Sequence, residues 1–443
     1  MPVDYLHLTP DDLRTERQQL LAAGRDVTPI ERDFDSLLRS PAPETPNWQR
    51  QAETLLDDAT ELPLRSEYDY TEPNRLAAIR AARPDESPVL PEKTTDRLLD
   101  DRIAGAWIGR CAGCLLGKPV ERWTGPEIHS FLHPSGQYPL TEYIRSDVPS
   151  AIANQYQMDA TGGFINEIDQ MPRDDDLDFT VIALDIVETY GTEFQTADLA
   201  SKWLTEFPVG RLYTAERVAY RNLCNGQTAP TTATTRNPYR ELIGAQIRAD
   251  LYGWVHPGQP AKAATLAWRD ARLSHVQNGL YGAMWVAAML AATPVTDSIP
   301  RLIRSGLAEI PANSRLAAAI TDVLNWYDAG HEYEHAIAAI RNEWNEDSLY
   351  GKYHTISNAQ IVASALLWGT GFSDSIQRAV QVGFDTDCNG ATVGSLIGLR
   401  LGQSALPDRW ITPLNGRLRT ALSSYAEPLI SELVDRTIPL VDA

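Results

Sequence analysis

Two stretches of the chain place a glycine at every fourth position, which puts the glycines on one face of a helix. The stretches are GAWIGRCAGCLLGKPVE, with Gly105, Gly109, Gly113 and Gly117, and VGFDTDCNGATVGSLIGLRLG, with Gly390, Gly394, Gly398 and Gly402. A glycine inside a helix costs about 1 kcal/mol relative to alanine, so such a row indicates that another backbone comes very close. We therefore expect two tightly packed, buried helices whose glycine faces lie near or against each other.

Carboxylates stand at the end of the first row and at the start of the second. Glu121 follows the first row, and Asp385 and Asp387 open the second. If the two helices pack together, these three side chains meet in one cavity. Two other interpretations remain open, because glycine rows also pair membrane helices and because plain core helices with small faces need no cavity.

Composition limits the class of protein. A chain of 443 residues can form one large domain or two to three smaller ones. Its 43% hydrophobic and 22% charged residues are typical of soluble globular proteins. No apolar run reaches the length of a membrane span, and the polar N-terminal stretch lacks the apolar core of a signal peptide. We therefore expect a cytoplasmic protein with no membrane partner.

The chain is acidic, with a formal net charge of −20. Such a charge repels nucleic acid and anionic membrane surfaces but is compatible with divalent cations. The four cysteines, Cys111, Cys114, Cys224 and Cys388, lie in apolar or helical contexts and do not indicate a disulfide framework. Cys111 and Cys114 form a CxxC without a second pair, which predicts buried core thiols.

The texture of the sequence changes near residue 97. Residues 1–96 are rich in proline and charge, with short helical patches at Pro10–Ala23 and Trp48–Leu56, and predict an N-terminal extension or small lobe. Residues 97–443 predict a single large all-α bundle, because apolar residues recur there at three- and four-residue spacing. The clearest such helices are Phe179–Tyr190, Thr196–Thr205, Gly279–Ala292, Arg315–Tyr327, Ser357–Leu367 and Ser373–Val382.

A second acidic cluster opens one of these helices, in PRDDDLDFTVIALDIVETYG. Aspartates at a helix N-terminus cap it and suit its dipole, which explains one or two of them. Three consecutive aspartates, Asp174 to Asp176, repel one another and require a counter-charge. Mg²⁺ is a hard cation that prefers oxygen ligands, so we expect this cluster and the Asp385/Asp387 turn to meet around one or two metal ions. In a purely structural protein the aspartates would only cap helices.

Within the cluster, Asp174, Asp175 and Asp178 spell DDxxD, the aspartate-rich motif of prenyl and terpene synthases. Those enzymes need a second metal motif of defined type. No glutamate falls at the required position after Asp385. The motif therefore does not favour that class.

His331, Glu332 and His335 spell HExxH, the pattern of zinc proteases. The preceding Asp328-Ala329-Gly330 predicts the end of a helix, which places His331 at the edge of a new helix rather than in its middle. The simpler interpretation is an acidic turn that faces solvent.

Four of these features, taken in order, resemble the ADP-ribosylglycohydrolase family. They are the glycine row that ends in Glu121, the aspartate cluster at Asp174–Asp176, Ser274-His275 in ARLSHVQNG, and the DTD motif at Asp385–Asp387. The resemblance covers roughly residues 97–402, and GAQIRADLYGWVHPG and TAERVAYRNL are similar to a larger, less-studied branch. It implies an all-helical fold that uses two Mg²⁺ ions.

The resemblance also implies roles for individual residues. Asp174, Asp175, Asp176, Asp385 and Asp387 would be metal ligands, with Asp387 bridging both ions. Glu121, Asp175 and Asp387 would be catalytic. Glu121, His275 and Asn389 would contact the substrate, although a hydrogen-bonded core histidine is an equal interpretation of His275.

The sequence departs from the family pattern at three positions. Cys388 follows Asp387 where many members place a metal-binding threonine, and a thiol is a poor ligand for Mg²⁺. Asp174 stands where many members have a threonine ligand. Arg110 lies in the glycine row where the family often has an aspartate.

By resemblance, we expect a Mg²⁺-dependent hydrolase, with Mn²⁺ as the other candidate ion. It would cleave the glycosidic bond at the ribose anomeric carbon of an ADP-ribosylated protein or a small ribosyl, nucleoside-like substrate. The alternative is a protein that binds ADP-ribose or a nucleotide with metal and does not cleave it. The sequence indicates neither the leaving group nor the oligomeric state.

Overall fold

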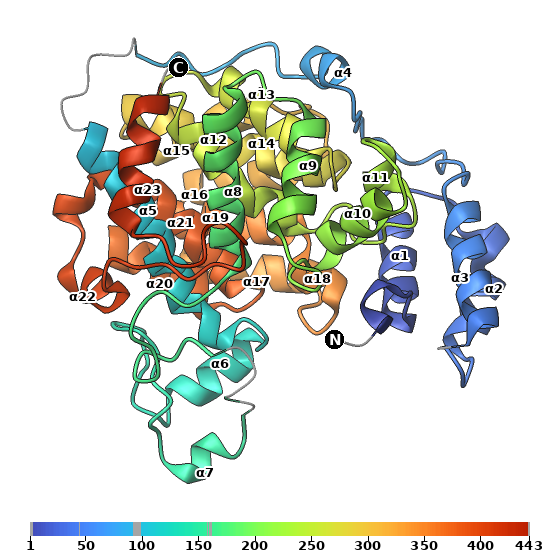
Figure 1. Ribbon diagram of the computed structural model, residues 1–443, viewed down its shortest axis with the longest axis horizontal. Helices are drawn as coiled ribbons and strands as arrows, with labels where there is room; N and C mark the ends of the chain where they lie inside the picture. Colours follow the sequence, from blue (N-terminus) through green and yellow to red (C-terminus); the bar gives the residue numbers. More distant parts are fainter. Residues whose placement is uncertain (1–2, 44, 92–98, 157, 159–161, 442–443) are drawn as a thin grey trace.

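The chain is built from helices joined by turns (Figure 1). The computed structural model describes residues 3–43, 45–91, 99–156, 158 and 162–441. Within these ranges there are isolated β-bridges but no strand, and no described helix is long and apolar enough to cross a membrane. The predicted all-α class is confirmed.

The centre of the bundle is the antiparallel pair α5 (Leu99–Gly117) and α21 (Thr386–Leu401). Their glycines face one another in register: Gly105 lies on Gly398, Gly109 on Gly394, and Gly113 on Gly390. A Cβ at any of these positions would come within 3.0 Å of the partner backbone, a distance that real side chains essentially never show. The predicted contact between the two glycine faces is therefore present.

The end of the second row differs from the prediction. Gly402 is the C-cap of α21 and has a φ of 81°, so it ends the helix instead of continuing the face. Glycine is favoured there because it adopts positive φ without strain. At the other end of the pair, the backbone of Thr386 takes the place opposite Gly117, and the Thr386 hydroxyl donates to the Gly117 carbonyl at 2.8 Å.

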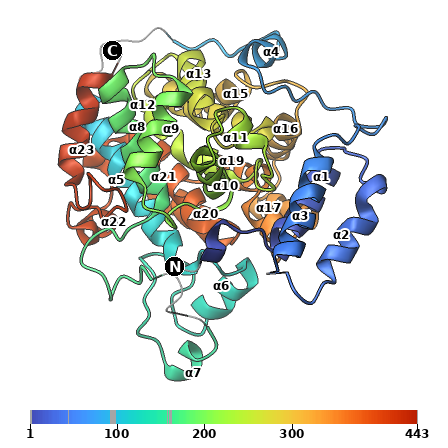
Figure 2. The ribbon, with the colours of Figure 1, turned by 45° about the vertical axis from the view of Figure 1, so that its right-hand side comes forward.

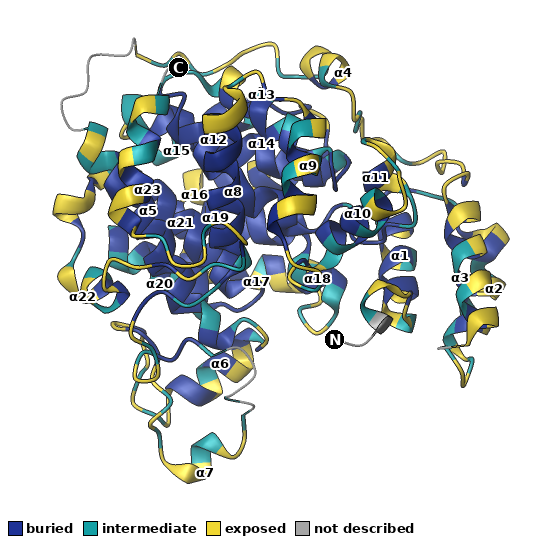
Figure 3. Ribbon diagram, in the orientation of Figure 1, coloured by how far each residue is buried: buried dark blue, intermediate teal, exposed yellow. Residues whose placement is uncertain are grey.

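Buried helices surround this pair (Figure 3). They are α8 (Asp175–Tyr190), α12 (Asp250–Trp254), α14 (Gln277–Ala292), α19 (Thr355–Trp368) and α20 (Phe372–Gln381). More peripheral are α9 (Thr196–Glu206), α10 (Thr214–Cys224), α11 (Thr231–Thr234), α13 (Pro260–Ala271), α15 (Ile299–Leu307), α16 (Arg315–Asp328), α17 (Tyr333–Glu343), α18 (Leu349–Tyr353), α22 (Asp408–Ile411) and α23 (Ile430–Thr437). Every helix predicted from apolar spacing is present, and most of the boundaries shift by only one to four residues.

The segment between α5 and α8 forms a protrusion below the bundle that carries α6 (Gly125–Leu132) and α7 (Ser150–Ala153) (Figure 1). Trp123, Phe131 and Tyr156 pack there with ring centroids 4.9–5.3 Å apart. The protrusion thus has its own aromatic cluster.

The HExxH residues do not form a metal motif on one helix. His331 lies in the turn before α17, and Glu332 is the N-cap of that helix. The imidazole rings of His331 and His335 stack on the surface, with their centroids 4.1 Å apart. Cys111 and Cys114 are free and buried, as predicted, whereas Cys224 is exposed.

The N-terminal segment packs against one side of the bundle (Figures 1 and 2). Helices α1 (Pro10–Ala22), α2 (Glu31–Leu38) and α3 (Pro46–Ala59) enclose a small apolar cluster of their own around Phe34 and Trp48. The chain then runs along the bundle surface through α4 (Leu76–Ala81). Helix α3 begins before the predicted Trp48 because the Thr45 hydroxyl accepts a hydrogen bond from the Trp48 amide and caps it.

Three mostly buried arginines of the bundle have carboxylate partners in this N-terminal segment. The pairs are Arg217 with Asp12 at 2.8 Å, Arg240 with Glu16 at 2.6 Å, and Arg315 with Glu72 at 2.8 Å. A buried charge without a partner is strongly unfavourable. The N-terminal segment therefore supplies a counter-charge to each of these cations.

Gly109→Ala tests the central glycine contact. The new Cβ would meet the backbone of Gly394, and overpacking of this kind costs about 1–3 kcal/mol. We expect a lower free energy of unfolding, even though alanine is intrinsically favoured over glycine in a helix by about 1 kcal/mol. Denaturant unfolding measures the change. Ala338→Ser adds one atom at an exposed position of α17 and should change stability by less than about 0.5 kcal/mol; a stabilised Gly109→Ala would contradict the packing argument.

Glu72→Gln tests the N-terminal counter-charges. The Glu72 carboxylate is 1% exposed and accepts hydrogen bonds from Tyr68, Asn278 and Arg315. Arg315 keeps its second partner, Glu241, at 2.7 Å, so we expect a loss of about 3 kcal/mol, the lower end for a broken buried pair. The matched control is Glu67→Gln, whose side chain is 70% exposed. Equal melting temperatures for both variants would refute this role of Glu72.

Candidate active site

A cavity of about 570 Å³ lies where α5 ends and α21 begins. Seven carboxylates line it: Glu121, Asp174, Asp175, Asp176, Glu216, Asp385 and Asp387. Lys118, Tyr213, Tyr353 and Cys388 are also among its lining residues. The three acidic segments that the sequence analysis expects to meet are thus brought together in one cavity.

A strained turn presents the DTD carboxylates. Gly383 and Phe384 both have positive φ, 84° and 60°, and a bulky residue held in that region costs about 1–3 kcal/mol. The turn is fixed because the Phe384 amide donates to Glu346 at 2.6 Å and the Asp385 amide donates to Asn358 at 3.1 Å. The structure around the turn therefore determines where Asp385 and the first turn of α21 point.

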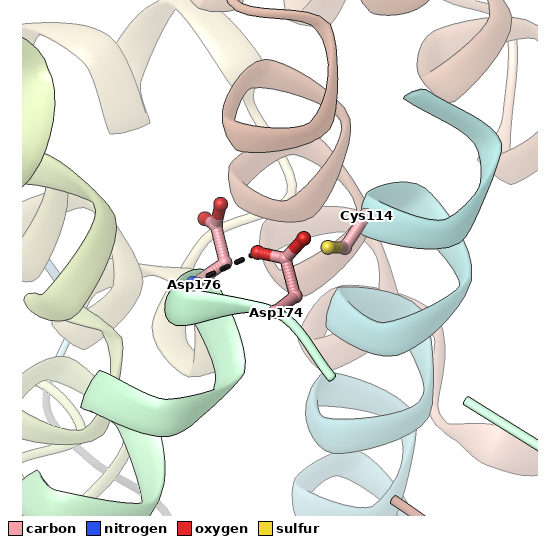
Figure 4. Close-up of side chains that lie close together, drawn as sticks. All are labelled: Cys114, Asp174 and Asp176. Carbon is pink, nitrogen blue, oxygen red and sulfur yellow. Dashed lines mark hydrogen bonds between the residues drawn. The ribbon is translucent and has the colours of Figure 1, made fainter. Parts of the chain in front are cut away.

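Both oxygens of the Asp174 carboxylate accept a hydrogen bond from a neighbouring group. Asp174 caps α8, accepting from the Asp176 amide at 3.0 Å through Oδ1 (Figure 4), and it accepts from the Lys118 ammonium at 2.6 Å through Oδ2. Burial alone would raise the pKa of Asp174, but the Lys118 ion pair holds that pKa below its ordinary value. The counter-charge expected for this residue is thus supplied by a lysine.

Asp176 also has a basic partner. Arg110 on α5 is completely buried and donates to the Asp176 carboxylate at 3.1 Å and to the Thr180 hydroxyl at 2.8 Å. On its other side, Arg110 pairs with Asp250 of α12 at 3.1 Å. The arginine that departs from the family pattern therefore ties α5, α8 and α12 together directly behind an acidic side chain of the cavity.

The sequence model of the ADP-ribosylglycohydrolase family matches residues 94–438. The chain belongs to this family. No curated protein matches the sequence. Among solved structures, one titled "ADP-ribosylglycohydrolase-related protein complex" is 20% identical, covers 78% of this chain and 99% of its own, and superposes with a TM-score of 0.47. As a member of the family, the chain is a glycosyl hydrolase, and the family is metal-dependent and acts on ADP-ribosylated substrates.

Three other carboxylates of the cavity, Glu121, Asp175 and Asp387, are buried and crowded by like charges. Burial raises the pKa of Asp175 and of Asp387 well above the ordinary value, and for Asp387 the next largest causes are the carboxylates of Glu121, Asp174 and Asp385. Burial, followed by the charges of Asp385 and Asp174, raises the pKa of Glu121 to about 7. Carboxylates crowded in this way favour a cation among them.

The donor atoms fit a metal ion. Single ligand atoms of Asp176, Asp387 and Cys388 lie within 4.8 Å of one another, and so do those of Cys114, Asp174 and Asp176. Most of these donors are carboxylate oxygens, which suit hard divalent cations. The two groups share Asp176, so this residue connects the α8 cluster with the DTD turn.

Two predicted substrate contacts lie outside the residues that line the cavity. His275 is buried, and its Nδ1 is 2.8 Å from the Ser274 hydroxyl, in a network with Arg248 and Glu216. Asn389 is buried and donates to Asn358 at 2.8 Å. Glu216 is the member of this network that lines the cavity, so any influence of His275 on a substrate would pass through Glu216.

Tyr5, near the start of the chain, contacts the segment beside the cavity. The Tyr5 hydroxyl donates to the carbonyl of Leu212, and Arg217 donates to the Tyr5 carbonyl at 3.0 Å. Tyr213, which directly follows Leu212, lines the cavity, and its hydroxyl accepts a hydrogen bond from Arg173 at 3.1 Å. Tyr5 thus helps to hold a segment of the cavity wall that is 207 positions away in the chain.

Sequence reasoning missed three residues that shape the site. Lys118 follows the glycine row directly, so a basic residue at that position was a usable signal. Asn358 and Glu346 fix the DTD turn through backbone amides far away in the chain. No local pattern indicates such contacts.

Asp387→Asn tests the crowding of like charges. In metal-free buffer at pH 7, we expect the variant to have a free energy of unfolding higher by on the order of 1 kcal/mol. The reason is that the fold raises the pKa of Asp387, so ionisation of this carboxylate destabilises the folded state. Thermal or denaturant unfolding in EDTA measures it. Asp374→Asn is the contrasting control: its carboxylate accepts from Arg378 at 3.0 Å and has a lowered pKa, so it should lose stability by less than about 1 kcal/mol. Destabilisation by both changes would contradict the electrostatic argument.

Proposed function

We propose that the chain is a Mg²⁺-dependent hydrolase that cleaves the glycosidic bond at the anomeric carbon of a ribose, in an ADP-ribosyl or related ribosyl substrate. The observation that carries the proposal is the single cavity in which Glu121, the α8 aspartates and the DTD turn face one another. Its volume of about 570 Å³ falls in the range of small-molecule sites, about 300–1,000 Å³.

Five aspartates are the proposed metal ligands: Asp174, Asp175, Asp176, Asp385 and Asp387. Asp174 is the least available of them, because both of its oxygens already accept hydrogen bonds from Lys118 and the Asp176 amide. When bound, Mg²⁺ supplies Lewis-acid polarisation and orients substrate oxygens. Mn²⁺ accepts the same oxygen donors and is the second ion to test.

The protein's own groups account for charge stabilisation and proton transfer. Cleavage at an anomeric carbon passes through an oxocarbenium-like state, in which positive charge develops on the sugar. The carboxylates of Asp175 and Asp387 lie in the cavity where they stabilise such charge. Glu121 lines the same cavity from the end of the helical segment that follows Gly117, and we assign to it the transfer of the proton.

The test is turnover of a pool of ADP-ribosylated peptides and ribosyl small molecules, followed by mass spectrometry with Mg²⁺, with Mn²⁺ and with EDTA. Release of a free ribose product that depends on the divalent ion supports the proposal and names the leaving group. Ligand recovered intact, together with a melting temperature raised by Mg²⁺, would replace it with a non-catalytic ADP-ribose or nucleotide-binding protein.

Glu121→Gln tests the proton-transfer role on the best substrate from that pool. We expect kcat to fall about 10²–10⁴-fold, while Mg²⁺ still raises the melting temperature. Asp387→Ala should instead abolish both turnover and the Mg²⁺ response. The control is Glu334→Gln at an exposed position of α17, which should leave kcat unchanged. Full activity of either Glu121→Gln or Asp387→Ala would refute the assigned role.

A further inference from the structure

A sulfur atom lies among the carboxylate oxygens of the cavity. Cys388 directly follows Asp387, lines the cavity and is 7% exposed. One ligand atom each from Cys388, Asp387 and Asp176 lie within 4.8 Å of one another. This thiol therefore occupies a position from which it can share a cation with two carboxylates.

The first turn of α21 orients the Cys388 side chain toward the acidic cluster. The Cys388 amide donates to the Asp387 carboxylate at 3.0 Å, and the thiol is hydrogen-bonded to the Asp385 carboxylate. The carboxylates with the strongest electrostatic influence on the sulfur are Asp176, Asp385 and Asp387. No repacking of α21 is needed to bring the sulfur to an ion held by those carboxylates.

The second sulfur, on Cys114, is in a different situation (Figure 4). It lies close to Asp174 and Asp176, but it is completely buried and is not among the residues that line the cavity. Both Asp174 oxygens are already bonded, one of them to the Lys118 ammonium at 2.6 Å. Each group has one protein cation beside it, Lys118 at Asp174 and Arg110 at Asp176. Only the group with Cys388 has its sulfur on the cavity wall, and it includes Asp387, which faces mainly other carboxylates.

We propose that Cys388 is a metal ligand and that the position formed by Asp176, Asp387 and Cys388 takes a divalent cation of borderline softness, of the Zn²⁺ or Co²⁺ type, in preference to Mg²⁺. The metal–sulfur bond forms as the thiol gives its proton to solvent, and no electrons are transferred. The inference rests on the proposed function and deepens it, since it adds this ion to a hard ion that the oxygen donors of the same site would hold, with Asp387 shared by both.

The physical reason is the match between donor and ion. Thiolate ligands select soft and borderline ions, whereas carboxylate and water ligands suit Mg²⁺ and Mn²⁺. A bound Zn²⁺ or Co²⁺ also favours the deprotonated sulfur, which burial otherwise disfavours. Two carboxylates and one thiolate make a donor set that Mg²⁺ uses poorly and Zn²⁺ uses well.

Co²⁺ titration of the metal-free protein tests this without any measurement of activity. A Co²⁺–thiolate bond absorbs in the near ultraviolet, and we expect this band to grow to a plateau in the full-length chain. All samples carry Cys224→Ser, because Cys224 is an exposed free thiol and its removal leaves only buried thiols to give the band. Cys388→Thr, which replaces the thiol by a hydroxyl, should lose the band and bind Co²⁺ about tenfold or more weakly.

The chain offers two matched controls on α5. Cys111→Ser and Cys114→Ser each remove a buried thiol and should leave the band in place. X-ray absorption of the Zn²⁺-loaded protein provides a second measurement that needs no cysteine variant at the site, with an expected Zn–S distance of about 2.3 Å.

Absence of both the band and the Zn–S distance would overturn the proposal, and so would a band that survives Cys388→Thr. A band lost only in Cys114→Ser would assign the sulfur to the other group and overturn it as well. Mg²⁺-dependent turnover is measured separately. Failure of the hydrolase proposal, with an intact Co²⁺–thiolate band, is therefore distinguishable from failure of the Cys388 assignment.

Discussion

Backbone contact between α5 and α21 is the constraint on which the rest of the structure depends. At the glycine positions no side chain separates the two helices, so the backbone of one lies directly against the backbone of the other. This approach fixes the end of α5 against the start of α21, where the Thr386 hydroxyl bonds to Gly117. A pair of helices held apart by ordinary side chains would not place Lys118 and Glu121 beside the DTD turn.

The site combines acidic residues that have a basic partner with others that mainly face like charges. Asp174 has Lys118, and Asp176 has Arg110. Asp387 faces mainly other carboxylates. Such a division means that the fold itself can hold part of the cluster in place, while the rest supplies attraction for a cation. Different side chains then hold the cluster in place and attract the cation. A change in one set does not remove the function of the other completely.

Features that depend on local spacing were predictable from the sequence. The helices, the two glycine faces and the acidic N-terminus of α8 follow from periodicity and capping preferences. The features that were not predictable also have physical causes. Gly402 continues the spacing of its row, yet the helix ends there because a positive φ is required. The ion pair between Asp174 and Lys118 was not predicted because it spans 56 positions of the chain. The placement of His275 and the support from Asn358 likewise depend on long-range contacts that no local pattern encodes.

The ion pairs between the N-terminal segment and the bundle have a consequence for the order in which the molecule forms. Asp12 and Arg217 are 205 positions apart, Glu16 and Arg240 are 224 apart, and Glu72 and Arg315 are 243 apart. The α5–α21 contact likewise joins helices from opposite halves of the chain. Contacts of such large sequence separation close large loops and slow folding. During synthesis the first helices must therefore wait for partners made much later, and the cavity assembles only when the ribosome has delivered almost the whole chain, so that no early fragment carries the reactive site.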